Sequence, residues 1–71
     1  MSKFIEKDPD KLSGAPVFKG TRVLVKSLFD YLEGGDSIDE FLSDFPTVSR
    51  TQITGLLEEL RLEAIPDTEA A

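Results

Sequence analysis

The chain has 71 residues, enough for a single domain with a thin core, because a domain this small buries only about 60% of the surface of its unfolded chain. It contains no cysteine, which excludes disulfides and thiolate metal sites, and no histidine, the commonest metal ligand and general base near neutral pH. We therefore expect a non-enzymatic binding module with no catalytic residue, no metal site and no cofactor. Dimerisation is the remaining common way to reinforce so small a core, and we expect a homodimer.

The net charge of −6 is unevenly distributed along the chain. Residues 1–26 hold six basic and three acidic residues, whereas residues 27–71 hold two basic and eleven acidic residues. A local positive patch can attract an anionic partner even on an acidic protein, although charge alone favours an ordinary solvated surface. The sequence has no apolar run long enough to cross a bilayer and no signal peptide, so we expect a cytoplasmic protein with no membrane partner.

The front of the chain predicts short β-structure. Residues 3–6 suit a short extended piece that stops at the turn Asp8-Pro9-Asp10. Val17-Phe18 and the run 21–25 flank the two-residue loop Lys19-Gly20, a pattern typical of a tight β-hairpin. Because an isolated hairpin is marginal in water, this one must pack on helices or pair with another chain.

Three amphipathic helices are predicted in the rest of the chain. The first begins near Val25 and ends at Gly34-Gly35. Two capping boxes, Ser37-Ile38-Asp39-Glu40 and Ser49-Arg50-Thr51-Gln52, open the second and third helices, and Pro46 ends the second. Their inward-facing residues are expected to be Val25, Leu28, Phe29 and Leu32; Ile38, Phe41, Leu42 and Phe45; and Ile53, Leu56, Leu57, Leu60 and Ala64.

The last two helices suggest a recognisable unit. A short helix, a tight turn and a longer capped helix form the layout of a helix-turn-helix, although short helix pairs also occur in plain structural bundles. We predict a mainly α fold of three helices with a short N-terminal β-hairpin. The single domain (1–71) divides into a β-like N-terminal segment (1–24), a three-helix helix-turn-helix core (25–65) and a flexible tail (66–71).

Residues 13–23, Ser-Gly-Ala-Pro-Val-Phe-Lys-Gly-Thr-Arg-Val, resemble the signature of a small prokaryotic family, domain of unknown function 433. That signature runs roughly Gly-x-Pro-hydrophobic-hydrophobic-x-Gly-Thr-Arg-hydrophobic, and the resemblance extends over nearly the whole chain, roughly residues 4–62. Gly-Thr-Arg alone is a weak signal, but with the downstream spacing it is specific. The downstream matches are Leu28, Leu32, Gly35, Asp36 and Phe45-Pro46.

This resemblance implies a homeodomain-like helix-turn-helix fold preceded by short strands, often in a homodimer. Members of the family are commonly regarded as antitoxins, of the VapB type, whose expected partner is a PIN-type ribonuclease toxin with an acidic, metal-binding site. The implied function is an antitoxin-like module that restrains such a toxin and binds its own promoter DNA. The alternative function is a sequence-specific DNA-binding repressor without a toxin partner.

Arg22, in the segment Gly20-Thr21-Arg22, is the first candidate for a contact with a partner. Its guanidinium suits bidentate contacts with a phosphate or with acidic groups of a partner protein, and Lys19 lies beside it in the sequence. The alternative is a structural role, in which Arg22 bridges to an internal carboxylate and fixes the hairpin against the helices. The carboxylates considered are those of Asp30, Asp36 and Asp44.

Arg50, Thr51 and Thr54 are the candidates on the third helix, near its start, where a helix-turn-helix protein reaches base edges. The alternative is that they are solvated cap and surface residues. The chain departs from the family pattern here, with Thr54 where members tend to have Arg and Glu59 where they often have Tyr. Because Lys and Arg supply most sequence-independent affinity for DNA, this acidic helix weakens the prediction of DNA binding.

Two features leave alternatives open. Gly55 within the third helix costs about 1 kcal/mol relative to Ala, and it either permits close approach of another backbone or is simply tolerated. The front of the chain also has more apolar surface than a small two-stranded feature needs, and a β-mediated dimer would bury it. The residues concerned are Phe4, Ile5, Val17, Phe18, Val23 and Leu24.

Overall fold

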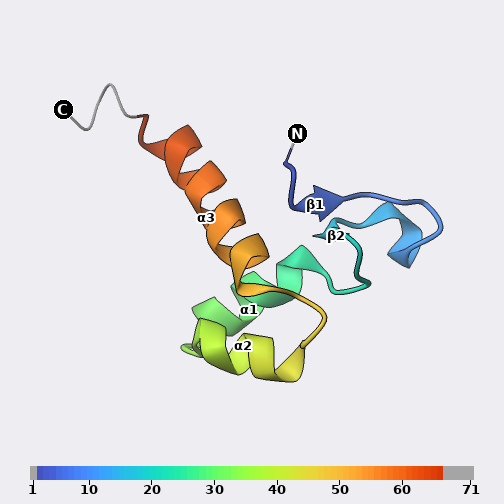
Figure 1. The fold of residues 1–71 in the computed structure, drawn as a ribbon, viewed down its shortest axis with the longest axis horizontal. Helices are drawn as coiled ribbons and strands as arrows, with labels where there is room; N and C mark the ends of the chain where they lie inside the picture. Colours follow the sequence, from blue (N-terminus) through green and yellow to red (C-terminus); the bar gives the residue numbers. More distant parts are fainter. Residues whose placement is uncertain (1, 67–71) are drawn as a thin grey trace.

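The computed structural model describes residues 2–66 and is mainly helical, with a short antiparallel hairpin at its front (Figure 1). This confirms the predicted fold class, while the expected tail falls almost entirely on residues 67–71, which lie outside the described part. Across residues 2–66, no helix has the length and apolarity that a membrane span requires. The elements in chain order are β1 (Ile5–Glu6), the short 3-10 turn η1 (Leu12–Gly14), β2 (Val17–Phe18), α1 (Val25–Glu33), α2 (Ile38–Asp44) and α3 (Arg50–Ala64).

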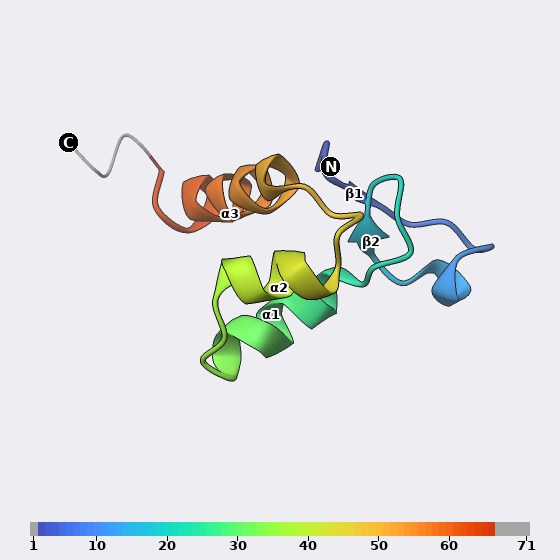
Figure 2. The ribbon, with the colours of Figure 1, turned by 60° about the horizontal axis from the view of Figure 1, so that its bottom comes forward.

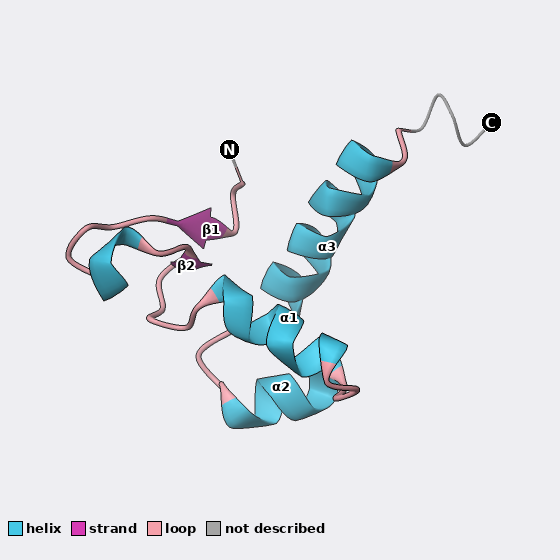
Figure 3. Ribbon diagram, turned by 180° about the vertical axis from the view of Figure 1, so that it is seen from behind, coloured by secondary structure: helices cyan, strands magenta, loops and turns pink. Residues whose placement is uncertain are grey.

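The strands β1 and β2 form a two-stranded antiparallel sheet at one end of the molecule (Figure 3). The chain turns between them at Asp8, as predicted. The carbonyl of Asp8 accepts the amide of Lys11 at 2.8 Å, and its Oδ1 accepts the amide of Asp10 at 2.9 Å. The register places Ile5 opposite Phe18 and Glu6 opposite Val17.

β2 pairs on both of its sides, and only one of these two pairings was predicted. We expected β2 to pair with residues 21–25 across a two-residue loop, and the tight turn does form, with the amide of Thr21 donating to the carbonyl of Phe18 at 2.9 Å. The pairing continues at the bridge between Val17 and Leu24, where the amide of Phe18 donates to the carbonyl of Val23 at 2.9 Å and the amide of Val25 donates to the carbonyl of Pro16 at 3.0 Å. It stops there because α1 begins at Val25, and β1 pairs with the other side of β2.

The helices α1 and α2 lie side by side and run in opposite directions (Figures 1 and 2). Their bounds agree with the prediction. α1 ends at two glycines, and Gly35 adopts a φ of 90°, in the left-handed region that favours glycine. Both predicted capping boxes are present, Ser37 with Glu40 at the start of α2 and Ser49 with Gln52 at the start of α3.

The core lies where β2, α1, α2 and the first half of α3 meet. The Tyr31 ring stands edge-on to Phe41, with centroids 5.2 Å apart, a geometry that contributes about 0.5–1.5 kcal/mol beyond the area buried. The Tyr31 hydroxyl donates to Oδ2 of Asp44 at 2.6 Å, which ties α1 to α2 and raises the pKa of Tyr31. The largest fully buried side chains are Phe18, Phe41, Leu28, Ile53 and Val17.

The second half of α3 extends beyond this core (Figure 1). Ile53 and Leu56 are buried, whereas Leu60 is 40% exposed and Ala64 is exposed. The prediction that Leu60 and Ala64 face the core was therefore wrong. The reason is length: α3 has 15 residues and is about 22 Å long, whereas α1 with 9 residues and α2 with 7 reach only about 13 Å and 10 Å.

Candidate functional site

Within residues 2–66, the basic side chains that form no ion pair all lie in the N-terminal third of the chain. Four basic side chains form an ion pair, and within residues 2–66 the other four do not: Lys3, Lys7, Lys19 and Arg22. Two of these flank the tight turn that follows β2, and both are exposed. We call residues 19–22, Lys-Gly-Thr-Arg, the basic loop.

Thr21 holds the basic loop from inside. It is the one buried polar side chain found among the described residues, at 7% exposure. Its hydroxyl donates to the carbonyl of Phe18 at 2.7 Å and accepts the amide of Val23 at 3.0 Å. The turn also depends on Gly20, whose φ of 78° is one that L-residues rarely adopt. The backbone that presents Lys19 and Arg22 is therefore fixed.

Glu6 of β1 holds the same loop from the side. Its Oε1 accepts the amide of Gly20 at 2.8 Å and the Nζ of Lys11 at 3.0 Å. The hydrogen bond from Gly20, followed by that from Lys11, lowers the pKa of Glu6 below its ordinary value of 4.5. The carboxylate is consequently ionised at neutral pH, where it anchors the loop.

Gln52 connects the basic loop to α3. Its Oε1 accepts the amide of Ser49 at 3.0 Å, which completes the capping box, and its Nε2 donates to the carbonyl of Lys19 at 2.9 Å. The second contact joins residues 33 positions apart in the sequence. One side chain therefore caps the helix and fixes the loop.

An open groove of about 420 Å³ lies beside the basic loop. Arg22 borders it and is exposed, and within residues 2–66 its side chain forms no ion pair or hydrogen bond. The internal bridge to Asp30, Asp36 or Asp44 that a structural role would require is thus not present. The lining residues are Lys11, Gly20, Thr21, Arg22, Val23 and Thr47.

The three candidates on α3 are exposed but form a separate group. Arg50 is ion-paired with Asp39 of α2, and the hydroxyl of Thr54 donates back to the carbonyl of Arg50 at 3.1 Å. In the described part of the chain, no hydrogen bond or ion pair joins the side chains of Arg50, Thr51 or Thr54 to the basic loop. The start of α3 reaches the loop only through Gln52.

Sequence reasoning missed the three residues that hold the basic loop. Gln52 was assigned only to its capping box, and Glu6 was assigned only to an extended piece. Thr21 had a usable signal, since a Thr hydroxyl in a turn can accept the backbone amide two residues further along the chain. The contacts of Glu6 and Gln52 had none, because each spans a long stretch of sequence.

Comparison with known proteins finds a family model that matches this chain. A family model described as "Protein of unknown function (DUF433)" matches residues 5–58, from β1 to the middle of α3, and includes the basic loop and both capping boxes. No curated protein and no solved structure matches the chain. The matched segment is well over half of the 71 residues, and the chain therefore belongs to the DUF433 family, as its Gly-Thr-Arg signature predicted.

Proposed function

We propose that this chain is an antitoxin-like binding module that restrains a PIN-type ribonuclease toxin. The observation that carries the proposal is the exposed Arg22, which has no ionic partner within residues 2–66, whereas Arg50 and Arg61 are paired with Asp39 and Glu58. The toxin expected from the family resemblance has an acidic site, and a guanidinium forms bidentate hydrogen bonds with carboxylates. Arg22 is the group that would make this contact.

The rigidity of the basic loop supports this role. Binding is weakened by the entropy lost when a flexible loop becomes ordered, typically about 0.5–1.5 kcal/mol for each immobilised side chain. Here the backbone is already fixed by Thr21, Glu6 and Gln52. Only the side chains of Lys19 and Arg22 remain to be ordered when a partner arrives.

The charge distribution supports a defined orientation. An acidic partner is repelled by residues 27–71, with eleven acidic and two basic residues, and attracted by the front of the chain. Such complementarity speeds association and suppresses wrong encounters. An acidic site on the toxin would therefore approach the basic loop and not α3.

The test is capture of the partner followed by reconstitution. A tagged protein is used to pull down its partners from nuclease-treated extracts of its native cells, and we expect one stoichiometric small ribonuclease. With the purified pair, Arg22→Ala should weaken inhibition roughly 10- to 100-fold, equivalent to about 1.4–2.8 kcal/mol. Lys7→Ala is the matched control, because Lys7 is exposed and unpaired among the described residues but lies outside the basic loop.

Two outcomes would contradict the proposal. If no ribonuclease is recovered, the proposal that the partner is a toxin is contradicted. If Arg22→Ala inhibits the ribonuclease as well as the wild type does, the proposed contact of Arg22 is contradicted. Circular dichroism of Arg22→Ala must show an intact fold. An unfolded variant would instead favour a structural role for Arg22.

We further propose that the module is a homodimer, because so thin a core benefits from a partner. The apolar residues that suggested a β-mediated dimer are largely used within one chain. Val17 and Phe18 are fully buried, and Ile5 and Val23 pack against the core. A dimer would therefore use another surface, and light scattering coupled to size-exclusion chromatography would give its mass.

The alternative function, a sequence-specific DNA-binding repressor, rests on the exposure of Arg50, Thr51 and Thr54 near the start of α3. The ion pair between Arg50 and Asp39 opposes a contact of the Arg50 guanidinium with a DNA phosphate. The test is a gel shift on the chain's own upstream DNA over a range of salt concentrations. A salt-sensitive complex would support this function, and its absence would exclude it.

A further inference from the structure

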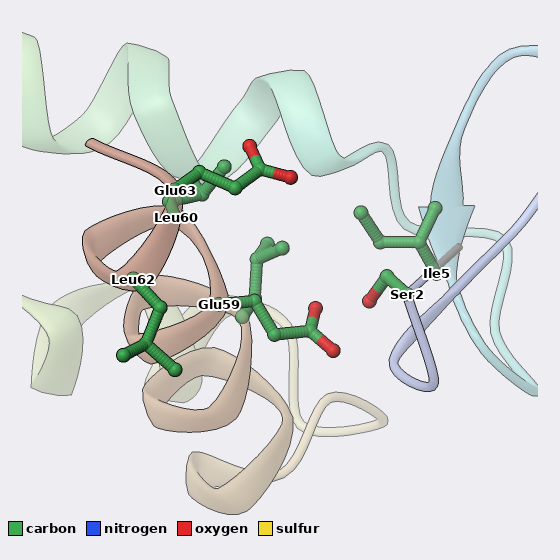
Figure 4. Close-up of a pocket in the computed structure, with 7 residues that line it drawn as sticks. Ser2, Ile5, Glu59, Leu60, Leu62 and Glu63 are labelled. Carbon is green, nitrogen blue, oxygen red and sulfur yellow. The ribbon is translucent and has the colours of Figure 1, made fainter. Parts of the chain in front are cut away.

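A second groove, remote in sequence from the basic loop, lies between the N-terminal segment and the far half of α3 (Figure 4). Its volume is about 440 Å³. Ser2 and Ile5 border it on one side and α3 on the other. Most of the α3 side lies beyond residue 58, where the match to the family ends. The α3 residues of this wall are Leu56, Glu59, Leu60, Leu62 and Glu63.

Exposed apolar side chains lie on the α3 side of this groove and next to it. Leu60 is 40% exposed and Leu62 41% exposed, and Ile65, just beyond the helix, is 51% exposed. These are three of the four large apolar side chains that stand out as exposed in residues 2–66. Leu60 and Leu62 both line the groove, and apolar surface that is exposed at a groove is typical of an interaction site on a soluble protein.

Glu59 contributes a carboxylate to the groove, and one of its oxygens has no hydrogen-bond partner in residues 2–66. Its Oε1 is buried and has no hydrogen-bond partner there. Figure 4 shows its carboxylate extending from α3 toward Ser2 and Ile5. Leaving a buried carboxylate oxygen without a donor is unfavourable, and an ammonium or guanidinium group placed beside the Glu59 carboxylate would reduce that cost by compensating its charge. Glu63 lines the same groove, and within residues 2–66 no basic side chain does.

We propose that this groove docks a segment of a partner protein that presents apolar and basic side chains on one face, as a basic amphipathic helix does. Its apolar side chains would cover Leu60 and Leu62, and a Lys or Arg would pair with Glu59. The inference rests on the proposed function only in assigning this segment to the protein that the module restrains. Its surface is distinct from the basic loop.

Charge complementarity selects this occupant over a second copy of the chain. In a two-fold symmetric dimer the same surface faces itself, so that Glu59 and Glu63 would meet the same carboxylates of the other copy. Within residues 2–66 no basic side chain lines the groove, so the same surface of the other copy brings no charge that would compensate these carboxylates. Like charges brought together in an interface oppose binding.

The test uses a defined probe and the full chain. A fluorescent 18-residue helical peptide with leucines on one face and lysines on the other is titrated by anisotropy, beside a peptide with glutamate in place of lysine. We expect the lysine peptide to bind and the glutamate peptide not to bind. Glu59→Gln should weaken binding about tenfold, since a charge-assisted hydrogen bond is lost. Leu60→Ser should also weaken it.

The matched control is Glu33→Gln, which makes the same change of charge at an exposed position at the end of α1. Glu33→Gln should bind the lysine peptide with an affinity within about twofold of the wild type, because salt screens an exposed charge that lies far from the peptide. Equal loss in Glu59→Gln and Glu33→Gln would show only a general attraction to an acidic protein and would overturn the inference. A wild-type dimer that dissociates with Leu60→Ser would assign the groove to a second copy and would also overturn it.

The same variants separate this inference from the proposed function. One outcome is that the toxin is captured in an Arg22-dependent manner and yet binds Glu59→Gln and Leu60→Ser with the same affinity as the wild type. In that case the inference about the groove is overturned and the proposed function stands. If no toxin is recovered but the lysine peptide binds with the expected dependence on Glu59, the proposed function fails and the groove is supported.

Discussion

The Thr21 side chain shows how a single residue can shape a surface that it does not itself present. Its hydroxyl bridges the carbonyl of Phe18 and the amide of Val23, while Lys19 and Arg22 point their charges outward on either side. A buried hydroxyl of this kind stabilises a fold only while both partners are present, because each backbone group has lost its water. The basic loop therefore depends on this hydroxyl.

Thr21→Val keeps the shape of the side chain and removes both hydrogen bonds. We expect it to lower the free energy of unfolding by about 1–3 kcal/mol, because the amide of Val23 is left without its partner. Urea denaturation followed by circular dichroism measures the change. Thr21→Ser, which retains the hydroxyl, should lose less. Equal stability of Thr21→Val and the wild type would show that water replaces the hydroxyl.

Glu6 predicts how stability varies with pH. Its lowered pKa means that folding favours the carboxylate, so its contribution is complete above the ordinary value of 4.5 and is lost as the pH falls through the lower, folded-state pKa. Glu6→Gln should lower the Tm at pH 7 and should flatten the decline of Tm below about pH 4.5. Thermal unfolding between pH 7 and about pH 3 measures both effects. Parallel profiles for the two proteins would contradict this role.

At the scale of elements, the packing of the N-terminal segment on α3 depends on a missing side chain. A Cβ on Gly55 would overlap the ring of Phe4, which lies against the helix at that point. Gly55 is therefore not simply tolerated in the helix, because it permits another group to approach α3 closely. The approaching group is an aromatic ring and not a backbone.

A double-mutant cycle tests this packing. Gly55→Ala improves helix propensity by about 1 kcal/mol, but the displaced ring should reverse the benefit, since overpacking typically costs about 1–3 kcal/mol. We therefore expect a net loss of stability in the wild type. In a Phe4→Ala background the same substitution should stabilise by about 1 kcal/mol. The same sign in both backgrounds, measured by urea denaturation, would show that ring and helix are not coupled.

The elements that could be predicted are those formed by interactions between residues close together in the sequence. The bounds of α1, α2 and α3 are encoded by local signals, the capping boxes at Ser37 and Ser49 and the glycine at the end of α1. The pairing of β2 with residues 21–25 was predicted from the local turn, whereas its pairing with β1 was not, because Glu6 and Val17 meet only after the loop between them has folded. Periodicity likewise placed Leu60 on the apolar face of α3, but it could not show that no helix reaches that far.

The candidate site was predicted in part, for the same reason. The Gly-Thr-Arg signature singled out Arg22, but it left open whether the guanidinium bridges to an internal carboxylate or faces solvent. The residues that position it, Glu6 and Gln52, act across long sequence separations. Residue type and spacing thus indicated which side chains are available for a contact. The residues that hold those side chains in position could be identified only from the folded structure.

At the scale of the whole molecule, the protein is a small core with an extended arm. Its radius of gyration is 13.1 Å, whereas a compact domain of this length has about 11 Å. The arm is the far half of α3, which has few buried side chains to hold it. Stability is therefore unequal along a single helix.

Hydrogen exchange should reveal this inequality. In the free protein we expect the amides of Ile53 and Leu56 to exchange slowly, near the rate set by global unfolding, and those of residues 60–64 to exchange much faster through local opening. Native-state exchange read by NMR gives each rate. A partner that covers the far half of α3 should slow the fast group selectively. Uniform protection along α3 in the free protein would contradict the description of this half as an arm.

The two strands are only two residues long, and this has a consequence for association. A sheet so short exposes almost no row of free amides and carbonyls, and such rows are the template on which β-rich segments aggregate. Ile5, Val17 and Phe18 favour β-structure, yet the sheet gives them no edge along which copies could add indefinitely. The chain can thus leave Leu60 and Leu62 of α3 exposed while its strand-forming residues remain poor seeds for fibrils.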